Sequence, residues 1–261
     1  MTDLYAVIGD PVSHSLSPVI QQAAFDAAGI DAEYSAIRLV RENLPGFLDD
    51  IRTGRLSGAN VTMPHKHPVF ELVDRVEGDA VLAESVNTLV AAGGEVVGLS
   101  TDIPAIQAEW SRKRLPEGSV LVLGSGGAAA AALVALSGME VFASARSEVR
   151  LEELLGRLGL TARVVPWATP VPGAVVVNAT PIGMGNESLP AGLLAESDGL
   201  FDMAYGPLPT PAVVSARALA VPVVDGLDML VAQAGLSFEA WTGLRPPLKV
   251  MLEAAQIAQG W

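Results

Sequence analysis

The stretch SVLVLGSGGAAAAALVA, residues 119–135, constrains the fold more than any other part of the chain. Val120 to Leu123 predict a buried strand, Gly124 to Gly127 end it, and the alanine-rich run that follows predicts a helix. Glycines at such a turn let the backbone approach a pyrophosphate, and the N–H groups that open the helix bind the anion. The motif ends in Ala129 rather than glycine, which is still small enough for close packing. The turn predicts a dinucleotide site, with a plain buried strand–turn–helix as the alternative.

Length and composition limit the classes of protein to which the chain can belong. With 261 residues it is long enough for one large or two ordinary domains, and the glycine turn near the middle is expected to open the second. A net charge of −13 argues against nucleic acid or an anionic membrane as partner. Cysteine is absent, no apolar run is long enough for a bilayer, and the N-terminus lacks a signal-peptide pattern. We therefore expect a cytoplasmic protein.

The first hundred residues alternate between strand and helix signals, which indicates an α/β domain. Ser17 suits a helix N-cap and Pro18 the first helical position, so a helix is expected from there to about Ala28. A hairpin is predicted around Gly93-Gly94. The other expected elements are strands at Leu4–Gly9, Ala32–Leu39 and Gly58–Thr62 and a helix at Leu44–Arg52.

Polar residues gather at the end of the strand predicted at Gly58–Thr62, in the segment NVTMPHK, residues 60–66. In open α/β sheets ligands bind outside the carboxyl ends of the strands, so we expect a loop here that carries chemistry. A lysine that exchanges a proton near neutral pH needs its pKa lowered, and an apolar surrounding can do this. Lys66 is therefore a catalytic candidate, with a solvated surface lysine as the alternative. His65 and His67 have a poor spacing for a metal and are interpreted as structural or surface residues.

Asp102 stands at the start of a helix predicted from Ile103 to Arg114. A carboxylate in this position often only caps the helix. The alternative is an acid that partners Lys66, and the spacing along the chain leaves both open.

The strand predicted at Val141–Ser144 ends about 20 residues after the glycines, where a dinucleotide domain recognises the ribose 2′ position. An NAD site calls for an acidic residue there. This chain has Ala145-Arg146-Ser147, whose donors suit a 2′-phosphate, although Glu148 lies close by. The segment favours NADP, with a solvated arginine as the alternative.

The rest of the second half again alternates between strands and polar turns. Residues 178–184, NATPIGM, and residues 202–207, DMAYGP, each follow a predicted strand. The expected elements are a helix at Leu151–Leu158, strands at Ala162–Val165, Ala174–Val177, Gly199–Phe201 and Val221–Val224, and helices at Leu227–Thr242 and Pro246–Gln259.

With these segments laid out, the chain resembles the shikimate dehydrogenase family, whose members reduce 3-dehydroshikimate to shikimate on the route to aromatic amino acids. The resemblance covers nearly the whole length. It rests on the ordered motifs SLSP at 15–18, NVTMPHK at 60–66, VNT at 86–88, TD at 101–102, GSGGA at 124–128, NATPIGM at 178–184, Gly226 with Met229-Leu230 and Gln233, and Phe238 with WTG at 241–243.

The resemblance implies an α/β fold with an N-terminal substrate domain, residues 1–101 with 229–261, and a Rossmann-like NADP domain, residues 102–228, with the active site in the cleft between them. It implies shikimate or 3-dehydroshikimate as ligand, NADP as cofactor, no metal, and a monomer or homodimer. Lys66 and Asp102 would form the catalytic pair. Ser15 and Ser17 would hold the substrate carboxylate, and Asn60, Thr62, Asn87, Tyr205 and Gln233 its oxygen groups. The cofactor would bind Gly124, Ser125, Gly126, Gly127, Ala128, Ala145, Arg146, Ser147, Met203 and Gly226.

Four departures from the family pattern keep other functions open. Ser100 replaces a common asparagine, and Pro104-Ala105 replaces a nearby glycine. Ala145 replaces the asparagine that usually precedes the arginine, and Asp228 stands where a small residue is common. The alternatives are a relative that acts on quinate or an aminated shikimate, with NADP or NAD as cofactor, and a sensor that binds a shikimate-like acid without turnover.

Overall fold

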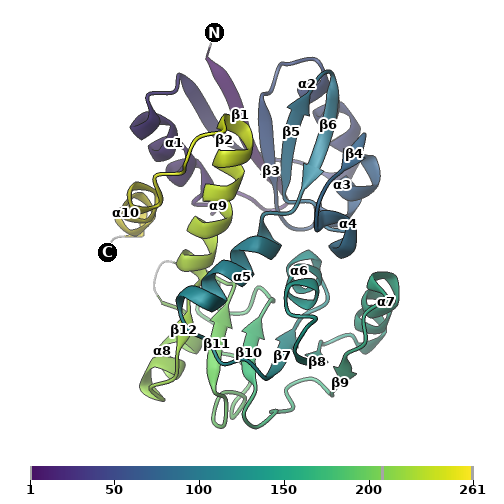
Figure 1. The fold of residues 1–261 in the computed structure, drawn as a ribbon, viewed down its shortest axis with the longest axis vertical. Coiled ribbons are helices and arrows are strands. Elements are labelled where there is room, and N and C mark those ends of the chain that lie inside the picture. The colour runs from purple at the N-terminus through teal and green to yellow at the C-terminus, as the bar shows by residue number, and fades with distance from the viewer. Residues whose placement is uncertain (1, 207–208, 260–261) are drawn as a thin grey trace. The chain divides into compact units, whose positions relative to one another are not determined.

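A computed structural model describes residues 2–206 and 209–259 (Figure 1). The chain divides into two compact units: unit 1 comprises residues 1–101 and 231–261, and unit 2 comprises residues 102–230. The two ends of the expected substrate domain, Met1 and residues 260–261, and Pro207 of the second polar turn lie outside the described residues. Each unit is built around one six-stranded sheet.

The sheet of unit 1 has the order β2-β1-β3-β5-β6-β4. β1 runs parallel to β2 and β3, β5 runs antiparallel to β3 and β6, and β4 runs parallel to β6. Because Asn60 pairs with Thr88 and Thr88 with Leu99, the end of β3, the start of β5 and the end of β6 share one edge, here called the carboxyl edge of the first sheet. The strands are β1 (Asp3–Gly9), β2 (Ala32–Arg38), β3 (Gly58–Val61), β4 (Arg75–Val76), β5 (Thr88–Ala92) and β6 (Glu95–Leu99).

Helices cover both faces of this sheet because side chains alternate along each strand. On one face Ala6 and Ile8 of β1 pack in a buried cluster with α2 (Leu44–Arg52) and with residues of α3 (Lys66–Leu72) and α4 (Ala80–Ala83). The other face carries α1 (Ser17–Ala28) and the later part of α9 (Gly226–Thr242), and α10 (Leu248–Ala258) packs along α1 (Figure 1). A short 3₁₀ helix, η1 (Arg41–Asn43), precedes α2.

Aromatic rings fix α9 onto the second face of the first sheet. Phe25 of α1 stacks on Tyr5 at 4.9 Å and meets Phe238 of α9 at 5.6 Å between ring centroids. The indole N–H of Trp241 donates to the carbonyl oxygen of Leu89 at 2.9 Å. Gly58 leaves room for this ring, since a Cβ there would lie 2.6 Å from its nitrogen. The segment after residue 230 therefore packs as an integral part of unit 1.

The sheet of unit 2 is wholly parallel, with the order β12-β11-β10-β7-β8-β9. The strand order reverses between β7 and β10, which makes the carboxyl ends of these two strands the topological switch point of a doubly wound fold. The strands are β7 (Ser119–Leu123), β8 (Glu140–Ser144), β9 (Arg163–Val164), β10 (Val175–Asn178), β11 (Gly199–Asp202) and β12 (Val223–Val224).

The core of unit 2 lies on both faces of its sheet. On one face Leu121 and Val176 pack in a buried cluster with α8 (Pro211–Ala218). On the other, Trp110 of α5 (Asp102–Arg112) stacks on Phe201 at 6.1 Å. The remaining helices are α6 (Gly127–Ala135) and α7 (Glu148–Leu158). The expected α/β class with a Rossmann-like part is confirmed.

Three local predictions were wrong. Ser17 is the first residue of α1 rather than its N-cap: the N-cap is Leu16, and the Ser15 hydroxyl oxygen accepts the Ser17 N–H at 3.2 Å. Lys66 opens helix α3 instead of lying in a loop, because Met63-Pro64 completes the turn before it. α7 begins at Glu148, three residues earlier than expected, since Ser147 caps it. Within the described ranges, none of the helices has the length and apolarity needed to cross a bilayer.

Candidate functional site

A buried network of amides and hydroxyls occupies the carboxyl edge of the first sheet. Its centre is Asn60, 5 % exposed, whose side-chain oxygen accepts the Tyr34 hydroxyl at 2.7 Å. The Asn60 amide donates to the Asn87 carbonyl oxygen at 3.1 Å and to the Ser237 hydroxyl at 2.9 Å. Buried amides are rigid when all their partners are in place, so Asn60 is held in one orientation.

Asn87, directly before β5, joins this network to Thr101 and to α9. Its side-chain oxygen accepts the Thr101 N–H at 2.8 Å, and its amide donates to the Thr101 hydroxyl at 2.9 Å. The same amide reaches the Gln233 side-chain oxygen at 3.4 Å. Three of the expected substrate-binding residues, Asn60, Asn87 and Gln233, are thus brought together from separate segments of chain. Because Asp102 follows Thr101, these bonds also fix the backbone from which its side chain projects.

Two hydroxyl residues of the network were missed by reasoning from sequence. Ser237 is fully buried, lies 2.8 Å from the Thr88 hydroxyl, and donates to the Gln233 carbonyl oxygen at 3.1 Å. Thr88 also donates to the Asn87 side-chain oxygen at 3.1 Å. The available signal was spacing, since Ser237 stands one helical turn after Gln233 and therefore on the same face of α9.

The remaining expected groups of unit 1 lie at the ends of β1 and β3 and at the start of α1. Ser15 and Ser17 are joined by the hydrogen bond described above, and Ser17 is buried while Ser15 is half-buried. Thr62 packs its methyl group against Gly9, where a Cβ would lie 2.5 Å away. The close approach of these two segments requires glycine at the end of β1.

Lys66 is half-buried in the first turn of α3, and its carbonyl oxygen accepts the Val86 N–H at 3.0 Å. His65, 1 % exposed, contacts the Leu39 carbonyl oxygen through Nε2 at 2.6 Å, so it is a structural residue that fixes the start of the helix. Asp102 belongs to unit 2, where it is the first residue of α5 and 4 % exposed. Both catalytic candidates therefore stand at the start of a helix.

In unit 2 the glycine turn has the geometry that a dinucleotide diphosphate needs. Gly124 has a φ of +122°, and a Cβ there would lie 2.8 Å from the Ala179 carbonyl oxygen. Gly126 is the N-cap residue of α6. A Cβ on it would meet no protein atom within 4 Å, so the space beside the first N–H groups of the helix is open. Ser125, Gly127 and Ala128 complete the turn and open the helix. These features fit the anion-binding helix start predicted from the sequence.

The end of β8 presents donors to solvent. Ala145 is buried, Arg146 is exposed, and the Ser147 hydroxyl oxygen accepts the Arg150 N–H at 3.4 Å. Ser147 therefore acts as a helix cap as well as a candidate ligand. Reasoning from sequence did not single out Arg150, although it stands four residues after Arg146 and is also exposed. Two guanidinium groups at the start of α7 suit a phosphate better than a ribose hydroxyl.

The loop after β11 is packed tightly against the start of α9. A Cβ on Gly226 would lie 2.1 Å from the Ala204 carbonyl oxygen and 2.8 Å from the Cβ of Tyr205. Met203 and Tyr205 are half-buried in this loop. Because this contact leaves no space for a side chain, only glycine fits at position 226, and the contact sets the position of the loop.

Asp228, which departs from the family pattern, stabilises unit 2 by ion pairs. Its carboxylate pairs with Arg112 at 2.5 Å and with Lys113 at 2.7 Å, and it accepts the Asp225 N–H at 3.3 Å. The hydrogen bond to Glu109 is the largest cause of a raised pKa of Arg112, and the charges of Glu109 and Asp228 raise it further. Asp228 thus links the start of α9 to the end of α5.

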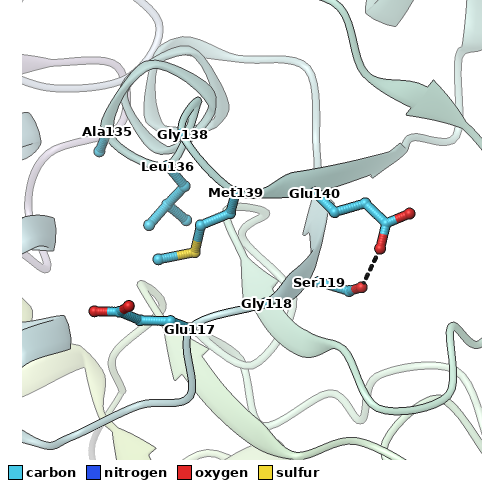
Figure 2. A pocket seen from close by; sticks show the side chains of 8 residues that line it. All are labelled: Glu117, Gly118, Ser119, Ala135, Leu136, Gly138, Met139 and Glu140. Carbon is cyan, nitrogen blue, oxygen red and sulfur yellow. Dashed lines mark hydrogen bonds between the residues drawn. The ribbon is translucent and has the colours of Figure 1, made fainter.

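A surface hollow lies elsewhere in unit 2 (Figure 2). It is lined by Glu117, Gly118, Ser119, Ala135, Leu136, Gly138, Met139 and Glu140. Ser119 and Glu140 begin β7 and β8, so the hollow is at the amino ends of these strands, opposite the edge where α/β sheets bind ligands. Among residues 2–206 and 209–259 no group of three or more His, Asp or Glu side chains is placed to hold a metal ion.

Comparison with known families agrees with this geometry. The model of the shikimate dehydrogenase substrate binding domain matches residues 7–89, and that of the shikimate 5′-dehydrogenase C-terminal domain matches residues 226–256. The first match contains the segments of Ser15, Asn60 and Lys66, and the second contains Gln233 and Ser237.

Relatives extend the match to the whole chain. Shikimate dehydrogenase (NADP(+)) from Pyrococcus abyssi is 38 % identical over 258 residues, which cover 95 % of both chains. A shikimate 5-dehydrogenase from Thermus thermophilus, solved with NADP(H) and shikimate, is 36 % identical and superposes with a TM-score of 0.89 over 98 % of this chain and 100 % of that one. A 5-ketofructose reductase of Gluconobacter is 25 % identical, with a TM-score of 0.84 over 99 % of both chains. The chain belongs to the shikimate dehydrogenase family.

Proposed function

We propose that the protein is an NADP-dependent shikimate dehydrogenase, which reduces 3-dehydroshikimate reversibly to shikimate on the route to aromatic amino acids. The observation that carries this proposal is the hydrogen-bonded group of Asn60, Asn87, Thr101 and Gln233 at the carboxyl edge of the first sheet. Fixed amides of this kind suit a ligand with several hydroxyl groups, because each amide has both a hydrogen-bond donor and an acceptor. Membership of the family and the curated and solved relatives named above support it.

The substrate-binding groups follow from the placement of the polar side chains. Ser15 and Ser17, beside the start of α1, hold the substrate carboxylate. Asn60, Thr62, Asn87 and Gln233 of unit 1 and Tyr205 of unit 2 bind its ring oxygens. Because the amides are oriented by protein contacts before any ligand arrives, little side-chain ordering is left for the binding step.

NADP binds the turn and helix starts of unit 2. The turn from Gly124 to Ala128 would hold the diphosphate. Arg146 and Ser147, which follow the buried Ala145, would bind the 2′-phosphate, and Met203 and Gly226 would contact the cofactor. Bound there, the nicotinamide supplies or accepts the hydride. The exposed guanidinium of Arg146 complements the charge that NADP adds over NAD.

Lys66 and Asp102 handle the proton. Hydride addition to a ketone places charge on the carbonyl oxygen, and the Lys66 Nζ stabilises that charge and donates a proton to it. The Asp102 carboxylate accepts a hydrogen bond from a substrate hydroxyl and orients the lysine. In the reverse direction the same Nζ takes the proton from the alcohol.

A second candidate rests on Ser100, whose buried hydroxyl oxygen has no hydrogen-bond partner among the described residues. Ser100 lies directly before Thr101 of the network. Its hydroxyl group could form a hydrogen bond with a polar atom of a different substrate, such as quinate or an aminated shikimate. The similar 5-ketofructose reductase is named for a different ketone, which supports this alternative.

A protein that senses a shikimate-like acid without turnover is the third candidate, and such a protein needs no proton donor at Lys66. We further propose a cytoplasmic monomer or homodimer.

The Lys66→Met variant tests the assignment. If Lys66 donates the proton, kcat for shikimate with NADP falls about 10²- to 10⁴-fold while shikimate still binds, measured by calorimetry. Lys113→Met is the matched control, since that lysine pairs with Asp228 in unit 2 and its loss leaves kcat unchanged. Equal kcat in wild type and Lys66→Met would contradict the mechanism, and a wild type that binds shikimate without turnover would favour the sensor.

A further inference from the structure

Asp202, the last residue of β11, is a fully buried carboxylate for which the proposed reaction has no use. Its two oxygens accept three hydrogen bonds. Oδ1 accepts the Asn178 amide at 2.8 Å and the Ala204 N–H at 3.1 Å, and Oδ2 accepts the Thr210 hydroxyl at 2.5 Å. A buried charge is retained in a protein only when it is so paired, which indicates that these bonds are important to the local structure.

The partners of Asp202 extend the network into two further segments. The Asn178 amide also donates to the Ile182 carbonyl oxygen at 2.9 Å, and its side-chain oxygen accepts the Thr180 hydroxyl at 2.6 Å. The Thr210 hydroxyl oxygen caps α8 by accepting the Val213 N–H at 3.2 Å. The loop after β10, the loop after β11 and the start of α8 are therefore joined through one carboxylate.

These loops in turn touch the parts of unit 2 that are proposed to hold the cofactor. A Cβ on Gly124 would lie 2.8 Å from the Ala179 carbonyl oxygen, so the loop after β10 leaves no space for a side chain at this position of the glycine turn. Gly183, with a φ of +107°, approaches Thr210 so closely that a Cβ would lie 3.1 Å from the threonine side chain. The loop after β11 carries Met203 and Tyr205 and packs on Gly226, as described above.

We propose that Asp202 is a positioning residue for cofactor and substrate: through Asn178, Ala204 and Thr210 it fixes the loop after β10, which approaches Gly124, and the loop after β11, which carries Met203 and Tyr205. This inference rests on the proposed function for the identity of the ligands. Asp202 itself touches neither ligand. Its contribution is to keep a loop that would otherwise sample several conformations in the one that binds.

The charge state of the network supports this role. Burial raises the pKa of Asp202 to about 6, against the hydrogen bonds from Thr210, Asn178 and the Ala204 N–H, which lower it. Asp225, before α9, raises it further through its own charge, and its carboxylate pairs with Arg217 of α8 at 2.9 Å. When Asp202 takes up a proton on Oδ2, this oxygen can donate to the Thr210 hydroxyl oxygen while Oδ1 still accepts from Asn178 and Ala204, so the three contacts persist in both charge states.

Asp202→Ala and Asp202→Asn test the proposal together. Alanine removes the acceptor of three buried N–H and O–H groups, so the Kd for NADPH, from fluorescence titration, and the KM for shikimate are both expected to rise about ten- to a hundredfold. Asparagine keeps an acceptor for Asn178 and Ala204 and a polar contact with Thr210, so both constants are expected within about threefold of wild type at pH 8. That rescue is a result that general destabilisation does not produce.

Two controls separate positioning from folding. Val176→Ala removes buried apolar volume two residues before Asn178, and we expect lower thermal stability with an unchanged Kd for NADPH. If Asp202→Ala does not fold, Thr210→Val removes the same hydroxyl contact with little change of shape, and Thr210→Ser restores it. Because protonated Asp202 offers the same acceptor and donor as asparagine, the Kd for NADPH of wild type is expected to stay within about threefold of that of Asp202→Asn from pH 5 to pH 8. Titration of the cofactor affects both proteins alike.

The outcomes distinguish this inference from the proposed function. A wild type that binds NADPH but turns over no shikimate refutes the function, and the Kd series still decides the role of Asp202. Unchanged NADPH binding in a folded Asp202→Ala protein, or equal losses in the alanine and asparagine variants, overturns the inference. A wild type that does not bind NADPH overturns both.

Discussion

Replacing Ser237 by alanine tests whether the network at the carboxyl edge of the first sheet is as fixed as its geometry indicates. The hydroxyl is fully buried and lies within 2.9 Å of the Asn60 amide and 2.8 Å of the Thr88 hydroxyl. It also donates to the Gln233 carbonyl oxygen at 3.1 Å. Alanine removes all these contacts and leaves only a small void.

The expected loss of stability follows from the groups that lose a partner. The Asn60 amide keeps its bond to Asn87 but loses the shorter one, and Thr88 loses its shortest contact. The Gln233 carbonyl oxygen lies within a helix and depends least on the serine. The loss of two buried hydrogen bonds, at groups that keep other partners, costs about 1–3 kcal/mol. Because Asn60 is then less well oriented, the KM for shikimate is expected to rise about three- to tenfold, with the KM for NADP unchanged.

Hydrogen exchange followed by mass spectrometry measures this loss within unit 1. A loss of about 2 kcal/mol raises the exchange of amides in residues 58–61 and 88–92 about thirtyfold under conditions where exchange reports the opening equilibrium. Ser111→Ala is the control, because Ser111 makes the same bond to a carbonyl four residues earlier but is exposed on α5, and we expect almost no effect. Exchange in Ser237→Ala equal to that in the control would show that the Ser237 hydroxyl does not stabilise the network.

Three further predictions concern unit 2. Arg146→Ala is expected to raise the KM for NADP at least about tenfold and to leave that for NAD within about twofold, since the guanidinium pairs only with the phosphate; equal effects on both cofactors in steady-state assays would contradict this. Asp228→Asn removes the pairs with Arg112 and Lys113, and because those cations are partly exposed we expect a loss of only about 1 kcal/mol in urea unfolding, which 1 M salt diminishes. The folded-state pKa of Asp202 is raised to about 6 from 3.8, so its stabilising contribution is present below pH 4 and is lost as the pH rises to 6. Unfolding measured from pH 4 to pH 7 should show wild type losing about 2 kcal/mol relative to Asp202→Asn, and parallel curves would exclude the shifted titration.

Much of the fold can be predicted from the sequence because its signals are local. The apolar run at β7 followed by glycines, the helical spacing of α2 and the paired glycines of the β5–β6 hairpin each specify an element from neighbouring residues. α8 was missed, even though Thr210 and Pro211 form an ordinary cap and first helical residue. Lys66 was placed in a loop because it follows directly after the strand predicted at Gly58–Thr62, whereas it opens α3.

The candidate site depends on contacts that no local pattern contains. Asn60 meets Ser237 across 177 positions of sequence, and only the register of β3 with β5 and the docking of α9 bring them together. Resemblance to the family motifs identified Asn60 and Asn87 as candidates, but it assigned no role to Thr88 or Ser237. Asp228 had no explanation until the ion pairs with α5 became visible.

Whether the protein is an NADP-dependent shikimate dehydrogenase is decided by the absorbance change of the nicotinamide when the purified protein is offered shikimate or quinate, each with NADP or NAD. We predict turnover of shikimate with NADP at a kcat/KM well above those of the other three mixtures. A clear preference for quinate or for NAD would contradict the assignment of substrate or cofactor. Four silent mixtures from a folded protein that binds shikimate would contradict the enzyme itself.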